Sequence, residues 1–283
     1  MSYLTLQRGM ELTNSIEDYP EGIVVVVDKP YRWTSADVIR KVKWMAIKHF
    51  HKKNLKVGHA GTLDPLATGV LLVCIGKATK LAETFQKARK QYIAGVTFGA
   101  TTASYDLEKE VDGFCDLGGV SEEALRGVLP SFVGEQDQVA PLFSAKSVDG
   151  VRVYEIARKR YKAGLPVDEL DVLQASRINI YDLSLQSYRG GVPSGRRATL
   201  LEGQQEIVSK ASSRINVAEV PEGLPQAEIL VDCSKGTYIR ALARDLGEAL
   251  GSGAFLHSLR RTKNGGFSVE EALSIEDISS IFR

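Results

Sequence analysis

The chain has 283 residues, 43% of them hydrophobic and 25% charged, which is the composition of a soluble, well-cored protein. A net charge of +1 neither favours nor excludes nucleic acid as a partner. The N-terminal stretch has no basic head before an apolar run, which excludes a secretory signal, and the apolar run 23–27 is far too short to span a membrane. The three cysteines are far apart, with no CxxC pair, which argues against a disulfide framework or a zinc site. We therefore predict a cytoplasmic protein.

Strands and helices are interspersed along the chain without a regular βαβ alternation, and this pattern predicts an α+β fold. The strands are short apolar or β-branched runs, and the first ends at Lys29-Pro30 because proline cannot continue a central ladder. The helices have 3.6-residue apolar spacing and caps such as Ser121. The predicted strands are 23–27, 70–75, 91–98, 175–188 and 227–234; the predicted helices are 34–46, 121–129, one from 153, and 238–250; the polar stretch 99–113 is predicted as a loop.

A single carboxylate, Asp64, lies among small and apolar residues in GHAGTLDPLATG, five positions after His59. One interpretation is local: Asp64 is a helix N-cap, Pro65 the first helical residue and Gly69 the end of a short turn. The other is that Asp64 reacts. A carboxylate in a partly apolar loop then needs a cationic partner to stay ionised.

The segment DCSKGTYIRALARDLG offers such a cation, because Tyr238 and Arg240 lie two residues apart at a strand-to-helix junction. An arginine fork can hold a carboxylate ionised and aimed, which a lone lysine does less well. The alternative is a simple helix start with Arg240 in solvent.

Basic residues are unevenly distributed. The run 40–56 contains seven lysines and arginines and no acid, whereas acids are concentrated at 11–21 and 270–277. This asymmetry favours a face that binds phosphates, and the alternative for any one cluster is a solvated helix face. The two lone histidines of the run, His49 and His51, are predicted to be surface residues.

The segment GHAGTLDPLATGVLLVCIGKATK closely resembles the catalytic motif of the TruB family, the tRNA pseudouridine synthases that modify the T loop. Four further segments resemble other motifs of that family in the same order, so the resemblance covers roughly residues 24–267 apart from 189–226. These segments are VVDKPYRWTSADVIRKVK, KQYIAGVTFGATTASYDLEKEVDG, QVAPLFSAKSVDGVRVYEIARK and VDCSKGTYIRALARDLGEALGSGAFLHSLRRTKNGGF.

The resemblance implies the pseudouridine synthase fold, a mixed and mostly antiparallel sheet flanked by helices with a central active-site cleft. The family's nucleophilic aspartate falls on Asp64, its base-stacking tyrosine on Tyr92, and its active-site tyrosine and arginine on Tyr238 and Arg240. The other implied substrate-site residues are His59, which contacts RNA; Asp106, which positions the substrate; Leu259, which lines the pocket; and Lys29, for which we expect a structural role more than a chemical one.

The implied function is isomerisation of uridine 55 in the T loop of tRNA to pseudouridine, with no metal or organic cofactor. The base must first be flipped out, at a cost of roughly a few kcal/mol, and stacking on Tyr92 offsets about 1–3 kcal/mol of it. Arg240 would keep Asp64 charged while Asp64 attacks the sugar, or assists a glycal route in which C2′ loses a proton. Both routes stay open. The run 40–56 would hold the RNA backbone around the flipped nucleotide. The expected partner is the T stem-loop of tRNA, with no membrane, no obligatory protein partner, and a monomeric enzyme.

We predict an N-terminal extension at 1–22, a catalytic domain at 23–267 and a short helical tail at 268–283. Residues 189–226, rich in Gly, Ser, Pro and charge, are predicted to be a surface excursion without an assigned function. Many bacterial members of the family continue into a small RNA-binding module of the PUA type, and we predict a short form without it.

Two alternatives belong to other classes. One is an RNA-binding, tRNA-folding module in which catalysis is secondary. The other is a glycoside hydrolase that uses Asp64 and Asp106 as a carboxylate pair, which would require hydrolase spacing and an activated water.

Overall fold

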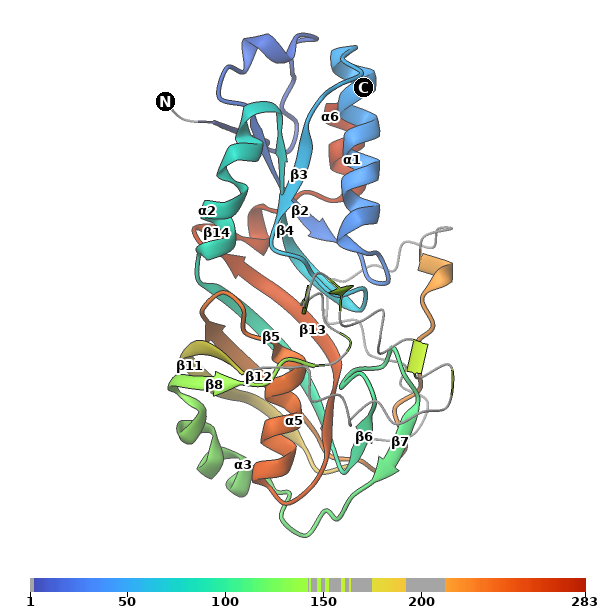
Figure 1. Ribbon diagram of the computed structural model, residues 1–283, viewed down its shortest axis with the longest axis vertical. Coiled ribbons are helices and arrows are strands. Elements are labelled where there is room, and N and C mark those ends of the chain that lie inside the picture. The colour runs from blue at the N-terminus through green and yellow to red at the C-terminus, as the bar shows by residue number, and fades with distance from the viewer. Residues whose placement is uncertain are drawn as a thin grey trace. The chain divides into compact units, whose positions relative to one another are not determined.

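In a computed structural model (Figure 1), the chain folds as two units that are each defined by their own backbone contacts. The structure describes residues 3–141, 143, 147–148, 151–152, 159–160, 163, 175–191 and 212–283. Unit 1 comprises Met1–Tyr92, Leu200–Ile215 and Leu259–Arg283, and unit 2 comprises Ile93–Thr199 and Asn216–Ser258. The strands β5 (Lys90–Phe98) and β13 (Ala254–Asn264) each contribute residues to both units. The domain boundaries expected from the sequence stay a prediction.

Unit 1 is built on a sheet in the order β1 (Leu4–Thr5), β2 (Ile23–Lys29), β4 (Ala67–Ile75) and β13. Two further strands pair with it, β3 (Val57–Ala60) with β4 and β14 (Phe267–Ser268) with β13. All nine residues of β4 are buried, in keeping with the apolar run 70–75. β13 pairs in parallel with residues 67–69 of β4, and β3 pairs antiparallel with residues 72–75. The loop 61–66, which contains Asp64, connects the end of β3 to the start of β4, next to the residues of β4 that pair with β13.

Helix α1 (Ser35–Phe50) begins at the predicted capping box, in which Thr34 and Asp37 bond each other's backbone, and ends at His51 in the left-handed region with φ 52°. α6 (Ile275–Ile281) lies beside α1 in Figure 1. The prediction for His49 was wrong. Its ring is buried, 3.3 Å from the carbonyl of Arg283 and edge-on to Phe282, because residues distant in sequence cover it. The other helices of unit 1 are η1 (Ile16–Asp18), η2 (Gly76–Leu81), α2 (Ala82–Lys87), η4 (Ser212–Arg214) and η5 (Val269–Glu271).

Unit 2 contains strands in the order β5, β12 (Gln226–Cys233), β11 (Ser176–Arg189) and β8 (Gly134–Gln138). The predicted loop 99–113 was partly wrong, because it holds the antiparallel pair β6 (Ala100–Thr102) and β7 (Val111–Phe114). The helix predicted from 153 and most of the excursion 189–226 lie outside the described residues. The remaining elements are α3 (Glu122–Val128), η3 (Leu129–Phe132), β9 (Ser147–Val148), β10 (Val151–Arg152) and α5 (Ile239–Ala249).

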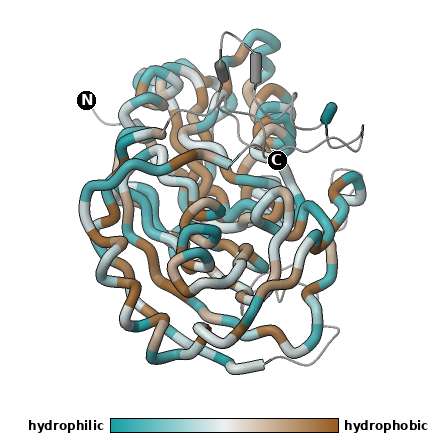
Figure 2. The backbone as a smooth tube through the Cα atoms, turned by 60° about the horizontal axis from the view of Figure 1, so that its bottom comes forward, coloured by the Kyte–Doolittle hydropathy of each residue, from teal (hydrophilic) through white to brown (hydrophobic). Residues whose placement is uncertain are grey.

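The hydrophobic segments recur along the strands, and hydrophilic segments recur at the outer turns (Figure 2). The three cysteines are free thiols, as predicted. Within the described ranges, no helix combines the length and the apolar character needed to cross a membrane.

Candidate active site

Asp64 lies in a turn and caps no helix. Its carbonyl accepts a hydrogen bond from the Ala67 N–H at 3.1 Å, and the chain passes directly into β4. The interpretation of Asp64 as an N-cap was therefore wrong, because the backbone after Pro65 pairs as a strand and leaves no helical N–H groups to cap. The sequence around Asp64 and Pro65 thus forms a tight turn, and the turn presents one carboxylate, that of Asp64.

The backbone on both sides of Asp64 is fixed by buried side chains. Ser35 Oγ, at the first residue of α1, donates to the Leu63 carbonyl at 3.1 Å and accepts from the Leu63 N–H at 2.9 Å. Lys29 Nζ donates to the Pro65 carbonyl at 3.2 Å. Since these contacts are made to the residues before and after Asp64, they set the direction of its side chain.

Lys29 is fully buried at the end of β2, where its Nζ donates to the carbonyls of Pro30, Trp33 and Pro65. Three acceptors match the three donors of an ammonium group. Burial lowers the pKa of Lys29 to about 7, and the negative charge of Asp64 acts in the opposite direction on that pKa. Lys29 therefore bonds the backbone beside Asp64 and is its electrostatic neighbour, and the structural role expected from the sequence stays a prediction.

Arg261 is a residue that the sequence interpretation missed. It is 1% exposed; its Nε donates to the Val70 carbonyl at 2.7 Å and its Nη2 to the Gly61 carbonyl at 3.0 Å. These bonds join β13 to the first residue of the Asp64 loop and to β4, which follows the loop. The positive charge of Arg261 also contributes to lowering the pKa of Lys29 and that of His59. The only sequence signal was its place in the LHSLRR stretch of the resembling segment.

The other predicted residues of unit 1 lie on its strands. His59 is in β3, half-buried, and within the described part of the chain its Nδ1 has no hydrogen-bond partner. Burial, with a smaller contribution from Arg261, lowers the pKa of His59, so its imidazole is neutral at pH 7. Leu259 lies opposite Ala67 in the β13–β4 register, and Tyr92, in β5, is 8% exposed.

Unit 2 carries Asp106 and Arg240, which face each other. Arg240 Nε lies 3.6 Å from Asp106 Oδ2, and both side chains are buried. Asp106 Oδ1 accepts from Ser104 Oγ at 2.6 Å and from the Glu108 N–H at 3.0 Å, while Arg240 donates to the carbonyls of Ser104 and Phe143 at 3.1 and 3.0 Å. The alternative of a solvated Arg240 was wrong. Pairing of Arg240 with Asp64, which the sequence predicts, stays a prediction.

Tyr238 is held at the start of α5 by a glutamine that sequence reasoning did not single out. The Tyr238 N–H donates to Gln138 Oε1 at 2.8 Å, and Gln138 Nε2 donates to the Tyr238 carbonyl at 3.2 Å. Gln138 is buried and is the first residue of the resembling segment QVAPLF. A primary amide that bonds both backbone groups of one residue fixes that residue's orientation.

The pKa of Lys29 makes a prediction about stability. Because its pKa is near 7 in the folded state and near 10.5 in the unfolded chain, the unfolded state binds more protons between these values. This contribution to the free energy of unfolding therefore rises with pH across that window, by at most about 1.4 kcal/mol per pH unit. In Lys29→Met the contribution disappears. Urea unfolding at pH 7, 8 and 9 should show the free energy of unfolding rising more steeply with pH for wild type than for the variant. Parallel pH dependences would contradict a lowered pKa of Lys29 in the folded protein.

Unit 1 thus holds one carboxylate on a fixed turn that is bonded by the buried side chains of Ser35 and Lys29, and a neutral imidazole, while unit 2 holds a buried arginine–carboxylate pair. Such a carboxylate can act as a nucleophile or base, and the neutral imidazole can hydrogen-bond a polar ligand.

Comparison with known proteins gives a family. The family model described as TruB family pseudouridylate synthase (N-terminal domain) matches residues 48–191, and that of the tRNA pseudouridylate synthase B C-terminal domain matches residues 240–283. The chain is 40% identical over 264 residues to tRNA pseudouridine synthase B of Phocaeicola vulgatus, covering 92% of each chain. It is 42% identical over 259 residues to the protein of the same name from Bacteroides thetaiotaomicron, again covering 92% of each.

Solved structures show the fold. A Cbf5–Nop10–Gar1 complex contains a chain that matches with a TM-score of 0.58 at 23% identity, covering 99% of this chain and 64% of that one. An H/ACA RNP bound to a substrate RNA containing 2′-deoxyuridine matches with a TM-score of 0.56 at 22% identity, covering 97% and 61%. The chain thus spans less than two thirds of either structural relative. The α+β fold predicted from the sequence is confirmed.

Proposed function

Because the chain belongs to the TruB family of pseudouridine synthases, we propose that it isomerises uridine 55 in the T loop of tRNA to pseudouridine. Its relatives from Phocaeicola and Bacteroides bear the name tRNA pseudouridine synthase B over nine tenths of its length. The observation that carries the proposal is the fixed turn at Asp64, held through the backbone of Leu63 and Pro65.

The reaction breaks the N1–C1′ bond of the uridine and forms a C5–C1′ bond, while C5 loses a proton and N1 gains one. It imports no group and transfers no electrons, so the proposal includes no cofactor. The target base leaves the stacked loop first, and stacking on Tyr92 offsets about 1–3 kcal/mol of that cost. Asp64 then attacks the sugar or, on the glycal route, accepts the C2′ proton. Both routes use the same carboxylate.

The remaining residues have supporting roles in this proposal. His59 as a neutral imidazole contacts the RNA, Leu259 lines the pocket, and Lys29 stabilises the turn and its charge. In unit 2, the buried pair of Asp106 and Arg240 positions the substrate, and the phenol of Tyr238 contacts it. Arg240 also orients Asp64 in the proposed complex.

Neither alternative is supported by a specific observation. A hydrolase acid must carry a proton to donate, whereas Asp106 accepts two hydrogen bonds on Oδ1 and faces Arg240 with Oδ2. A cytoplasmic, monomeric enzyme that needs no protein partner belongs to the proposal as well.

The test is tritium release from C5-labelled uridine in an unmodified T-arm hairpin, without added metal or cofactor. We expect wild-type protein to release the label of one uridine per RNA, at the T-loop target position. A matched hairpin with cytidine at that position should release none. Binding of the uridine hairpin without release, on full-length tRNA as well, would refute the proposal and favour the RNA-folding module.

A further inference from the structure

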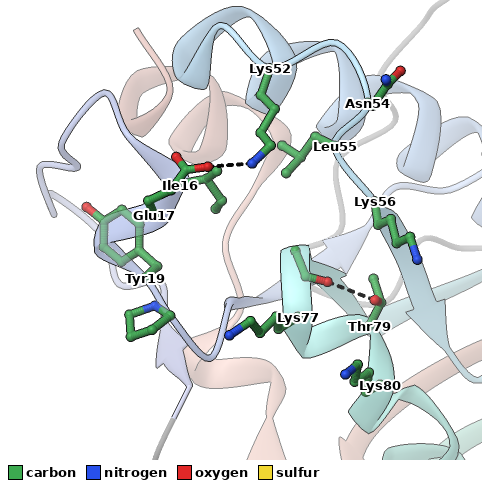
Figure 3. Close-up of a pocket in the computed structure, with 12 residues that line it drawn as sticks. Ile16, Glu17, Tyr19, Lys52, Asn54, Leu55, Lys56, Lys77, Thr79 and Lys80 are labelled. Carbon is green, nitrogen blue, oxygen red and sulfur yellow. Dashed lines mark hydrogen bonds and ion pairs between the residues drawn. The ribbon is translucent and has the colours of Figure 1, made fainter.

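Two adjacent pockets lie where β4 ends in unit 1. The first, about 410 Å³, lies between the connection from α1 to β3 and the helix η2 (Figure 3). The second has a volume of about 560 Å³ and is lined by that same connection, by the start of β3 and by α1. Asn54, Leu55, Lys56 and Thr79 line both pockets. The two pockets are therefore parts of one continuous surface.

Six exposed lysines line these pockets, and we name the five other than Lys52, which come from three segments, the distal lysine surface. Among the described residues, none of the five has a carboxylate within ion-pair distance. Glu17 is the one carboxylate among the described lining residues, and it pairs with Lys52 (Figure 3). Cations gathered without counter-ions produce a positive potential that attracts anions. The five are Lys43 of α1, Lys53 and Lys56 of the connection, and Lys77 and Lys80 of η2.

Asp64 and four of the five lysines, Lys53, Lys56, Lys77 and Lys80, belong to opposite ends of β4, whereas Lys43 lies in the middle of α1. The Gly76 N–H, just after β4, donates to the Lys56 carbonyl at 2.9 Å, whereas Asp64 precedes Ala67 at the start of the strand. Nine extended residues at about 3.3–3.4 Å per residue separate these ends by about 27 Å. The expectation that the whole run 40–56 grips the RNA around the flipped nucleotide therefore does not hold for Lys53 and Lys56.

We propose that the distal lysine surface binds the phosphate backbone of the substrate RNA at a segment remote from the isomerised uridine. This proposal rests on the proposed function. Lysines act as point charges toward phosphates and read no sequence, which suits a backbone contact. Phosphopeptide sites instead use arginine forks, and this surface contains no arginine. Membrane binding requires exposed large hydrophobic side chains, and none of those in the described part of the chain lines either pocket.

The separation of about 27 Å makes the effect depend on the length of the RNA. An RNA stem of five base pairs is A-form and rises less per pair than the roughly 3.4 Å of B-form DNA, so it spans less than about 17 Å. A short T-arm hairpin of this size, with its loop at Asp64, does not reach the distal lysine surface. Full-length tRNA extends further and can occupy both places.

The experiment compares wild type with the double variant Lys53→Gln/Lys77→Gln, which removes one lysine from each pocket. Dissociation constants for full-length unmodified tRNA and for the five-pair hairpin are measured between 50 and 200 mM salt. The logarithm of the association constant falls linearly with the logarithm of the salt concentration. For tRNA we expect this fall to be less steep in the variant, by about 1.4–1.8, because each lost phosphate contact contributes roughly 0.7–0.9 to the slope. We also expect KM to rise and kcat to stay unchanged, because the contact is present before and during the reaction. For the hairpin we expect no change.

The matched control is Arg126→Gln/Arg177→Gln, which removes the same charge from exposed ion-paired positions of unit 2. This control should keep the wild-type slope. Equal slopes for wild type and the lysine variant, or an equal loss of slope in the control, would overturn the proposal that the distal lysine surface binds RNA. Pockets that bind a free phosphate ion and contribute nothing to RNA binding would overturn it as well. Absence of turnover by wild type would instead count against the proposed function, because binding and turnover are measured separately.

Discussion

We expect Asp64→Asn to lower the rate of pseudouridine formation by about four orders of magnitude or more and to leave RNA binding and the fold intact. An amide has nearly the shape of a carboxylate, but it carries no negative charge for attack on the sugar and is no base for the C2′ proton. The turn survives the change, because Ser35 and Lys29 hold it through the backbone of Leu63 and Pro65. Single-turnover tritium release, together with the dissociation constant of the T-arm hairpin, measures both parts.

The matched control is Asp137→Asn, which removes the same charge from an exposed position of β8. It should keep the wild-type rate. A rate for Asp64→Asn within tenfold of wild type would exclude Asp64 as the reacting group. Asp137→Asn should keep the free energy of unfolding within about 0.5 kcal/mol of wild type, as is usual for surface substitutions, and urea unfolding of Asp64→Asn checks that this variant is folded.

We expect Gly69→Ala to destabilise the protein by about 2–6 kcal/mol. Gly69 has a φ of +94°, which an L side chain adopts only with strain of about 1–3 kcal/mol. A Cβ at this position would lie 2.2 Å from the carbonyl oxygen of Arg261, so the backbone of β13 would have to move at an overpacking cost of about 1–3 kcal/mol. Since Arg261 also bonds Gly61 at the start of the Asp64 loop and Val70 in β4, activity should fall together with stability.

Gly58→Ala provides the control within the same hairpin. Gly58 lies in β3 and has no positive φ, and a Cβ added there would have open space around it, because no atom of the described residues comes within 4 Å. We expect a change in the free energy of unfolding below about 1 kcal/mol. Urea denaturation of the two variants side by side gives the comparison, and similar stabilities would show that β13 does not approach β4 as closely as described.

The strands and caps of this chain could be predicted because their signals are local. The buried run of β2, the capping box at Thr34 and the N-cap Ser121 each depend on residues within one turn or strand. His49 could not be predicted in the same way, because the groups that bury it are near residues 13 and 283. The strands β6 and β7 were missed because their sequence is polar and their pairing is short.

In the candidate site too, local sequence signals could be predicted and contacts between distant segments could not. Short motifs identified Asp64 and Arg240 as residues of interest and predicted that they pair, but they gave no indication that Arg240 faces Asp106. Asp64 was also compatible with a helix cap, and only the pairing of the following residues in β4 removes that interpretation. Arg261 and Gln138 act through backbone carbonyls and N–H groups of distant segments, so their roles require the three-dimensional arrangement.

Helix α1 connects the two places in unit 1 to which functions have been proposed. Its first residue, Ser35, bonds the reactive turn, and the connection that follows its last residue carries Lys53 and Lys56. A helix of 16 residues at 1.5 Å per residue is a rod of about 24 Å. The length of α1 would then set the distance between the Asp64 turn and the proposed phosphate contacts of Lys53 and Lys56. Each helical turn added or removed would change that distance by about 5.4 Å and, under these proposals, would change which RNAs can occupy both places.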